Sequence, residues 1–288
     1  MEIITNIKQL QQKSISWIRQ GKSIGFVPTM GYLHEGHEAL MKAARQENDI
    51  VILSIFVNPL QFGESEDLNS YPRDEEHDRK VAEENEIDVI FFPSVDSMYP
   101  KPLSLELSVV RRADVLCGKS RPGHFDGVVT VLAKLFNMIH PTSVYFGMKD
   151  AQQIAVVDAL IKDFNYPINL TTVPTVREKD GLAKSSRNVN LFDQERIGAP
   201  FIQQALQYGR QLVENGEKNQ AELVKKIRQF LENKSHGNID YIELLSYPEL
   251  EPIELIDQQV ILAAAVFYQK ARLIDNVVFN EKGEKTLG

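Results

Sequence analysis

Cysteine is nearly missing from this sequence, since Cys117 is the single one among 288 residues. A disulfide framework within the chain is therefore excluded, and such a composition is typical of proteins that work in a reducing compartment. Long apolar runs are also missing, because the run from Val260 to Phe267 is far shorter than the ~20 residues of a membrane-spanning helix. The first residues lack a basic segment followed by an apolar one, so we expect no secretory signal and a cytoplasmic location.

Positive charge is scarce as well. The chain has 32 Lys and Arg against 40 Asp and Glu, which gives a net charge of −8. Nucleic acids and membrane surfaces attract proteins with an excess of positive charge, so we expect neither as a partner. If the ligand is an anion, the cationic groups that bind it must be gathered locally, and each cluster of Lys, Arg and His is worth inspecting.

Short β-rich runs alternate with helical patterns through the first two-thirds of the chain. The predicted strands are 24–28, 50–57, 87–92, 143–146 and 168–173, and the predicted helices are 37–47, 74–86, 127–139 and 150–163. This alternation predicts an α/β fold, with a mainly parallel sheet and helices on both faces. Ligands of such folds bind at the carboxyl ends of the strands.

The pattern changes near residue 176, and we expect a domain boundary at about 175. Residues 176–288 then form a smaller α+β domain, in which Asp180-Gly181 indicates a tight hairpin turn. Its predicted elements are helices at 193–214 and 219–233, strands at 239–245 and 273–279, and an apolar segment at 260–268. The closing residues, 280–288, resemble a frayed tail.

The segment 28–37 follows the first predicted strand and carries two histidines. His34 and His37 are three residues apart, so they share one face at the start of a helix, where unpaired N–H groups favour phosphate. Gly31 permits a tight turn, and Gly36 leaves room for an adenine ring. Two other interpretations stay open: a zinc site, because His-Glu-Gly-His is one residue short of a zinc motif, or two histidines that only cap the helix.

Two further segments place cations beside hydrogen-bonding groups. Residues 146–150 lie between a predicted strand and a helix, where Lys149 directs a cation toward the same edge of the sheet. Asp150 in this segment also suits a helix cap. Residues 184–188 combine two hydroxyls with Lys and Arg, which is a pattern that binds phosphate.

Two more segments bring amides and charges to the same edge. Asn58 and Gln61 follow the most buried predicted strand, and their amides are suited either to hydroxyl and carboxylate ligands or to tying down their own loop. Arg121 and His124 precede the helix 127–139 and are expected to add positive charge at its start. Asp126 is expected to cap that helix.

Six motifs in order closely resemble the pantoate–β-alanine ligase family, the pantothenate synthetases. They are PTMGYLHEGH (28–37), SIFVNPLQFG (54–63), YPR (71–73), RPGHFDGV (121–128), YFGMKDAQQ (145–153) and PTVREKDGLAKSSRN (174–188). The resemblance covers essentially the whole chain. It implies a Rossmann-like domain of the nucleotidyltransferase superfamily, residues 1–175, and a C-terminal lid domain, residues 176–288, with a KMSKS-like loop. It also implies a two-step reaction, in which pantoate and ATP form pantoyl adenylate and β-alanine then displaces AMP.

The resemblance further implies the site residues. Those expected to bind ATP are Met30, Gly31, Tyr32, Leu33, His34, Glu35, Gly36, His37, Gly147, Met148, Lys149, Asp150, Val176, Lys184, Ser185, Ser186 and Arg187. Gln61 and Gln153 are expected to bind pantoate, and Gln61 also β-alanine. The family assigns His37 as a proton donor. We interpret it as a charged or hydrogen-bonding stabiliser, because pyrophosphate with magnesium leaves without a proton.

The implied ligands are small molecules: ATP as its Mg²⁺ complex, pantoate and β-alanine, with no tightly bound organic cofactor and a homodimeric assembly. Lys184 departs from the Met or Leu familiar in relatives. The magnesium ligands stay open. Glu75, Glu76 and Asp78 are candidates, although a solvated helix face is the favoured interpretation of these three residues.

Three rival functions remain on sequence grounds. They are an adenylyltransferase acting on a phosphorylated metabolite, a nucleotide-sensing module without catalysis, and a zinc hydrolase. The paired glutamines Gln61 and Gln153 favour an acid with neutral hydroxyls over a phosphate ester, which requires more arginine.

Overall fold

The computed structural model of the chain describes residues 1–63, 68–69 and 71–287. It divides into two compact units, which are described separately below. Unit 1 consists of Met1–Ala113, Gly118–Phe146 and Val156–Val173, and unit 2 of Asp114–Cys117, Gly147–Ala155 and Pro174–Gly288. Two short segments that precede residue 156 therefore belong to the unit built mainly from the last part of the sequence.

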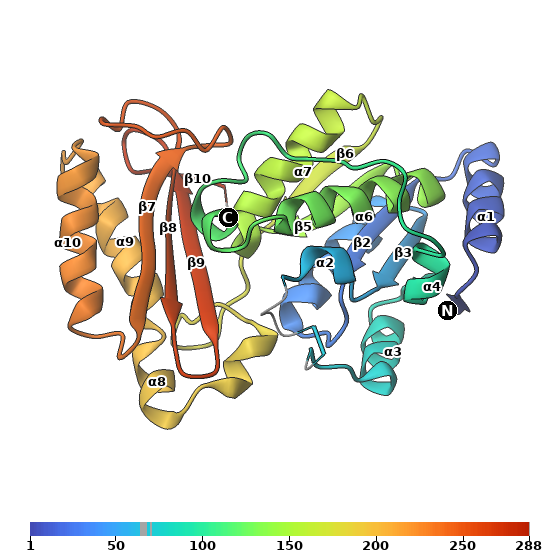
Figure 1. Cartoon of the computed structure of the whole chain (residues 1–288), viewed down its shortest axis with the longest axis horizontal. Helices are drawn as coiled ribbons and strands as arrows, with labels where there is room; N and C mark the ends of the chain where they lie inside the picture. Colours follow the sequence, from blue (N-terminus) through green and yellow to red (C-terminus); the bar gives the residue numbers. More distant parts are fainter. Residues whose placement is uncertain (64–67, 70, 288) are drawn as a thin grey trace. The chain divides into compact units, whose positions relative to one another are not determined.

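Unit 1 is built on a six-stranded sheet with the order β1-β4-β3-β2-β5-β6, of which Figure 1 labels β2, β3, β5 and β6. The strands are β1 (Glu2–Ile4), β2 (Ile24–Thr29), β3 (Ile50–Ile55), β4 (Val89–Phe91), β5 (Ser143–Gly147) and β6 (Asn169–Val173). The pairs β1–β4, β4–β3, β3–β2 and β2–β5 are parallel. Every residue of β3 is buried, as its near-continuous apolar run predicts. The predicted parallel α/β fold is confirmed.

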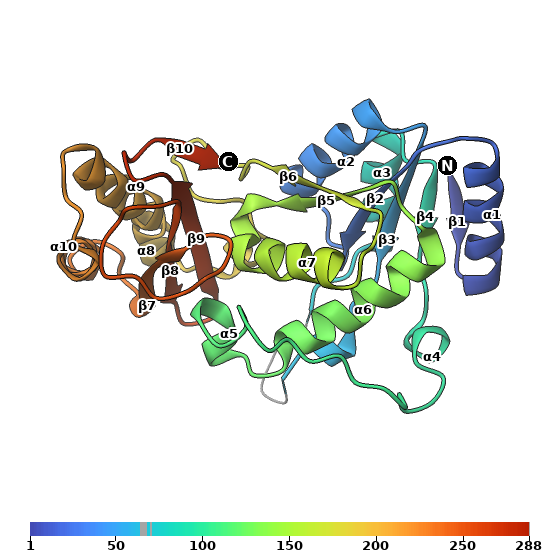
Figure 2. The same cartoon turned by 90° about the horizontal axis from the view of Figure 1, so that it is seen from above.

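Helices cover both faces of this sheet. They are α1 (Ile7–Arg19), α2 (Glu35–Glu47), α3 (Glu75–Glu84), α4 (Val95–Met98), α6 (His124–Ile139) and α7 (Ala151–Asp163), and the short helix α5 (Leu116–Ser120) precedes α6. Figure 2 shows α2 and α3 on one face and α6 on the other, and α1 packs against α6. The sequence pattern does not anticipate β1 and α1. In the part of the chain that the structure describes, no helix is long and apolar enough to span a membrane.

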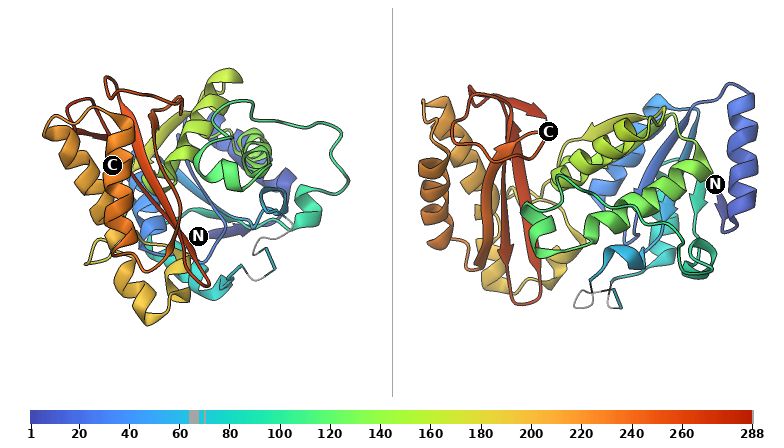
Figure 3. Two further views of the ribbon diagram at one scale, coloured as in Figure 1. Left: turned by 60° about the vertical axis from the view of Figure 1, so that its left-hand side comes forward. Right: turned by 45° about the horizontal axis from the view of Figure 1, so that its top comes forward.

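Unit 2 contains an antiparallel sheet with the order β10-β9-β8-β7. The strands are β7 (Asn238–Ser246), β8 (Val260–Phe267), β9 (Arg272–Phe279) and β10 (Lys285–Leu287), and the helices are α8 (Asp193–Gly198), α9 (Phe201–Glu214) and α10 (Gln220–Glu232). Helices α9 and α10 lie along one face of this sheet (Figure 3). Alternate residues of the strands, such as Leu244, Leu262 and Val277, form a core with these helices.

Three expectations about local structure are wrong. Residues 280–287 are not a frayed tail, because β10 pairs with β9, and Gly288 lies outside the described residues. Residues 193–214 do not form one helix, since Pro200 lacks the N–H that would continue the helical hydrogen bonds between α8 and α9. Asp126 is not a helix cap. Helix α6 starts earlier, at His124, and the Asp126 carboxylate instead accepts a hydrogen bond from the Val109 N–H at 2.7 Å.

Candidate functional site

The turn after β2 is held in shape by a buried carboxylate. Gly31 and Tyr32 both have positive φ angles, 84° and 54°, which fold the chain back directly after the strand. Asp78 of α3 accepts hydrogen bonds from the Tyr32 N–H at 2.9 Å and the Leu33 N–H at 2.7 Å. A Cβ atom at Gly31 would lie 2.8 Å from an Asp78 oxygen, so the turn requires glycine at this position.

Asp78 is therefore a structural anchor of this turn. Its exposure is only 2%, so the interpretation of this residue as part of a solvated helix face is wrong, whereas Glu75 and Glu76 are exposed. Burial raises the pKa of the Asp78 carboxyl, and the hydrogen bonds from Leu33 and Tyr32 oppose that shift. Within residues 1–63, 68–69 and 71–287, no three His, Cys, Asp or Glu side chains gather as metal ligands.

The two histidines of the turn form a capping box at the start of α2. The Gly36 N–H donates to His34 Nδ1 at 3.1 Å, and the His34 N–H donates to His37 Nδ1 at 3.2 Å. Each Nδ1 atom is therefore an acceptor, which places the ring proton on Nε2 and makes both rings neutral. A Cβ atom at Gly36 would lie 2.9 Å from the His34 ring, so this glycine accommodates the imidazole cap.

The helix-cap interpretation of these histidines is thus correct for one nitrogen of each ring, Nδ1. The other nitrogen, Nε2, is the one that carries the proton in the capped state. Capping and donation to a ligand are consequently compatible in His34 and His37, because they use different atoms. The helix start also supplies main-chain N–H groups and the positive end of the helix dipole.

Gln61 is joined to the same turn through Met30. The Gln61 Nε2 amide lies 3.1 Å from Met30 Sδ, and its Oε1 accepts from Asn58 Nδ2 at 3.2 Å. Asn58 is 1% exposed and also bonds the Gly127 carbonyl and the Tyr99 hydroxyl. The structure therefore brings Met30 and Gln61 together, and it gives Asn58 the role of tying down its own loop.

His124 does not add positive charge at the start of the helix predicted at 127–139, contrary to expectation. Its Nδ1 lies 2.8 Å from the Gln61 carbonyl oxygen, which only accepts, and its Nε2 lies 3.0 Å from the Arg121 guanidinium, which only donates. The ring must then carry its proton on Nδ1 and be neutral. Arg121 and His124 together hold the main chain at Gln61.

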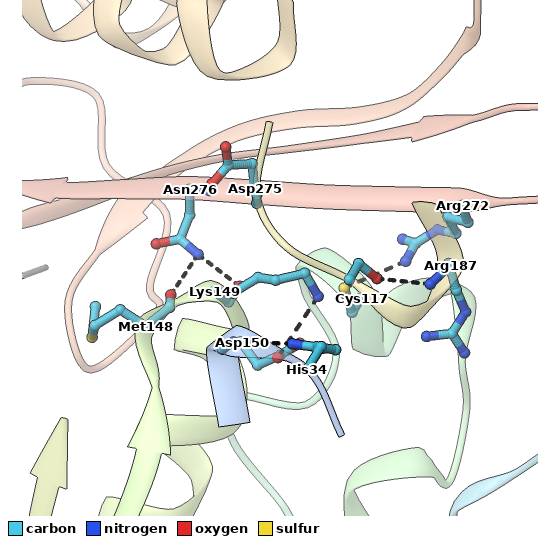
Figure 4. Close-up of polar contacts among 12 residues, drawn as sticks. His34, Cys117, Met148, Lys149, Asp150, Arg187, Arg272, Asp275 and Asn276 are labelled. Atoms are coloured by element: carbon cyan, nitrogen blue, oxygen red, sulfur yellow. Dashed lines mark hydrogen bonds and ion pairs between the residues drawn. The ribbon is translucent and has the colours of Figure 1, made fainter. Parts of the chain in front are cut away.

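In unit 2, the segment Gly147–Asp150 is fixed by a residue of β9. Strand β5 ends at Gly147, and a short 3₁₀ turn covers Met148–Asp150. The Asn276 Nδ2 amide donates to the carbonyl oxygens of both Met148 and Lys149, each at 2.9 Å (Figure 4). The Lys149 ammonium lies 3.9 Å from the Asp150 carboxylate. Gln153 follows in α7 and is partly buried.

The predicted Asp180-Gly181 hairpin is confirmed, and it joins two more candidate residues. The Lys184 N–H donates to the Val176 carbonyl at 2.9 Å, so these residues face each other across the hairpin. The Ser185 hydroxyl oxygen accepts from the Arg187 N–H at 3.2 Å and starts the 3₁₀ turn Ser186–Asn190. The loop 184–187 is thus an ordered continuation of the hairpin.

The candidate residues are distributed over both units. Unit 1 contains Met30–His37 and Gln61, and unit 2 contains Gly147–Asp150, Gln153, Val176 and Lys184–Arg187. Sequence reasoning missed the anchoring role of Asp78 and did not consider Asn276. One signal for Asn276 was present: the polar pair Asp275-Asn276 interrupts the apolar residues from Leu273 to Phe279.

A Rossmann-like parallel sheet, with a capped helix start directly after its central strand β2, defines a nucleotide-binding α/β protein. Residues 2–278 match the family model described as pantoate-beta-alanine ligase. The chain therefore belongs to the pantoate–β-alanine ligase family, and it is an enzyme of that ligase class.

Individual members of the family are similar to this chain over nearly their whole length. A pantothenate synthetase from Geobacillus sp. (strain WCH70) is 57% identical over 97% of this chain and 99% of its own. A crystal structure of pantothenate synthetase from Thermus thermophilus aligns with a TM-score of 0.89 and 39% identity, covering 96% of this chain and 99% of that one. The pantoate–β-alanine ligase from Francisella tularensis, crystallised with Beta-gamma ATP and β-alanine, has a TM-score of 0.78 and 37% identity over 98% of both chains.

Proposed function

We propose that this chain condenses pantoate with β-alanine in two steps that consume ATP. The pantoate carboxylate attacks the α-phosphorus of ATP, which forms pantoyl adenylate and releases pyrophosphate. The β-alanine amine then attacks the acyl carbon, loses a proton and displaces AMP, which leaves pantothenate. The observation that carries this proposal is the family match over residues 2–278, which includes all of the candidate site segments.

In the first step, the start of α2 is proposed to bind the ATP phosphates. Its N–H groups and the Nε2–H donors of His34 and His37 are suited to phosphate oxygens, because the capping box orients both rings. His37 then stabilises the negative charge of the pentavalent α-phosphorus as a neutral hydrogen-bond donor. This role replaces proton donation, since an Nδ1 that accepts from the main chain does not belong to an imidazolium.

The segments of unit 2 are proposed to bind the remainder of ATP. Lys149 contributes an ammonium, the loop 184–187 contributes hydroxyls and a guanidinium, and the main chain at Val176 contacts the nucleoside. Gln61 and Gln153 bind pantoate, and Gln61 also binds β-alanine. The contact of Gln61 with Met30 supports this assignment, because it places a pantoate-binding amide next to the ATP-binding turn.

The same proposal includes the form in which ATP binds, the location of the protein and its assembly. ATP enters with Mg²⁺ on its phosphates, and no tightly bound organic cofactor takes part. The Francisella tularensis relative supports ATP and β-alanine as ligands, since it was crystallised with Beta-gamma ATP and β-alanine. We propose a cytoplasmic homodimer, in which residues 1–175 bind ATP and pantoate and residues 176–288 close over ATP as a lid.

Exchange of labelled pyrophosphate into ATP tests the proposal. Exchange is expected when pantoate is present without β-alanine, because the first step is reversible, and AMP is expected to appear only after β-alanine is added. An adenylyltransferase would exchange only with a phosphorylated metabolite, and a nucleotide-sensing module would not exchange at all. Absence of exchange at saturating pantoate would reject the ligase mechanism for this chain.

A further inference from the structure

Strand β9 carries two adjacent polar residues, Asp275 and Asn276, between the apolar pair Leu273-Ile274 and the apolar run Val277–Phe279. Neighbouring residues of a strand project to opposite faces of the sheet. Leu273 and Val277, which share the face of Asp275, belong to the core formed with α9 and α10. Figure 4 shows the side chains of Asp275 and Asn276 pointing away from each other. Each face of β9 therefore presents one polar group.

Asp275 holds the hairpin that follows Val176. Its carboxylate accepts two hydrogen bonds from the Arg177 guanidinium, at 2.6 and 3.0 Å, and it is only 4% exposed. The Arg177 guanidinium also donates to the Gly181 carbonyl at 3.0 Å, and the Arg177 main chain forms an antiparallel β-bridge with Ala183. A planar, bidentate pair of this kind fixes direction as well as distance. The hairpin from 176 to 184 is thus oriented by β9.

Asn276 holds the segment Gly147–Asp150 from the other face. A primary amide nitrogen has two hydrogens, and Asn276 uses Nδ2 for the carbonyls of Met148 and Lys149. The main-chain N–H of Asn276 lies 2.8 Å from Asp275 Oδ1, which connects the two polar groups. The segment that carries the Lys149 ammonium is therefore attached to the same strand position as the hairpin.

The neighbouring strand leaves space for these polar groups. The β8 residues in register with Asn276 and Asp275 are Ala263 and Ala264. Small side chains at both positions allow the amide and the carboxylate to be directed at the nucleotide-binding segments. An ion pair withdrawn from water is often no more stabilising than an apolar pair of similar size. The Arg177–Asp275 pair, with side chains 25% and 4% exposed, is therefore better explained by orientation than by stability.

We propose that Asp275 and Asn276 are positioning residues that hold two ATP-binding elements, the 147–150 segment and the 176–184 hairpin, in fixed register on opposite faces of β9. Neither residue is assigned a contact with substrate. The proposal rests on the proposed function only in that it takes Lys149 and Val176 as ATP-binding residues. It predicts that a substitution at Asn276 lowers the reaction rate because it displaces Lys149.

The first test uses Asn276→Ala and Asn276→Asp in the full chain. Alanine removes both donors, and aspartate places a carboxylate against two carbonyl oxygens. We expect kcat/KM for ATP in pyrophosphate exchange to fall about tenfold to a hundredfold, further for aspartate than for alanine, because small displacements at a reacting centre have such effects. KM for β-alanine is expected to stay within about twofold of the wild-type value.

Asn280→Ala serves as the matched control. Asn280 lies just beyond β9, and its side chain hydrogen-bonds Lys282 and Glu284 in the turn before β10. It is expected to lower Tm as Asn276→Ala does while leaving exchange within about twofold. If Asn280→Ala and Asn276→Ala reduce exchange equally, general destabilisation explains the loss and the positioning role is rejected.

A double-mutant cycle with Lys149→Ala separates this inference from the proposed function. If Lys149→Ala leaves exchange unchanged, the site assignment fails whatever Asn276 does. If Lys149→Ala is impaired, Asn276→Ala should cost less than about threefold in that background, since the two residues act as one unit. A full additive loss overturns the inference. Should Asn276→Asp not fold, Asn276→Ser, which keeps one donor, is expected to lie between wild type and alanine.

Discussion

For three histidines near the proposed site, the hydrogen-bond partners determine which ring nitrogen carries the proton. Each of these partners can act only as a donor or only as an acceptor. His34 and His37 accept main-chain N–H groups at Nδ1, whereas His124 donates from Nδ1 to a carbonyl. All three rings are neutral in these arrangements. A sequence shows that histidines are present, but only the positions of their neighbours determine which nitrogen can serve a ligand.

The two ring nitrogens of His37 have different functions, since Nδ1 caps the helix and Nε2–H is proposed to bind the ligand, and this leads to a first prediction. Glutamate at the third position of a helix also completes a capping box, and an ionised carboxylate has no N–H, so His37→Glu should keep the cap of α2 while removing the Nε2–H donor. We expect Tm to stay within about 2 °C of wild type and the exchange rate to fall about a hundredfold to a thousandfold. His37→Ala is the comparison: a comparable loss of rate with a lower Tm is expected, and wild-type exchange in His37→Glu would contradict the assigned role.

Asp78 gives a prediction about pH. Because burial raises the pKa of its carboxyl above the ordinary value of 3.8, the folded protein binds this proton more tightly than the unfolded chain. The stabilisation from this carboxyl is therefore fully present below pH 3.8 and is lost as the pH rises through the folded pKa. Asp78→Asn does not titrate, so we expect the Tm advantage of wild type over the variant to shrink as the pH rises above 3.8. An advantage that grows with pH would contradict the direction of the shift.

At the scale of elements, the start of α2 shows how far the sequence pattern reaches. The glycines, the histidine spacing and the preceding strand predict a phosphate-binding helix start, and the structure contains the strand, the turn and the helix. The pattern does not contain the anchor of the turn, because Asp78 lies 45 residues beyond Leu33 and meets it only through packing of α3 against α2. Local sequence signals predicted the start of α2, whereas the turn before it is held by a residue that is distant in the sequence, Asp78.

Gly36→Ala tests the steric part of this arrangement. Alanine favours a helix over glycine by about 1 kcal/mol, but its Cβ would lie 2.9 Å from His34 Cε1 and displace the capping ring, which costs about 1 kcal/mol. We expect the free energy of unfolding to change little, while exchange falls at least about tenfold because His34 is no longer oriented. Circular dichroism melts and exchange rates measure the two effects, and unchanged exchange would show that the ring can move without loss.

At the scale of the whole molecule, the units do not follow the order of the sequence. Segments 114–117 and 147–155 belong to unit 2 because its strands hold them. The Tyr247 hydroxyl donates to the Ala151 carbonyl, Asn276 binds the main chain at Met148 and Lys149, and Gln152 binds the main chain on either side of Leu116. A division at a single point near residue 175 would separate these partners.

A fragment of residues 174–288 is therefore expected to be unstable, although it contains all four strands of the unit 2 sheet. It lacks the partners of Asn276 and Tyr247, which are main-chain carbonyls of residues 148, 149 and 151. We expect a less cooperative melt than that of the full chain, and partial recovery when a peptide of residues 144–158 is added. A cooperative melt at the full-length Tm would show that residue 174 starts an independent domain.

The sequence by itself determined the α/β class of unit 1, the helix start at 34–37 and the hairpin at 180–181, because each depends on periodicity, glycine and capping within a few neighbouring residues. It also carried enough ordered motifs to indicate the ligase family. The tertiary structure decided which residues hold those segments: Asp78 under the turn, and Asp275 and Asn276 on the two faces of β9. These contacts join positions 45 to 128 residues apart, where no local pattern relates the partners and only packing brings them together.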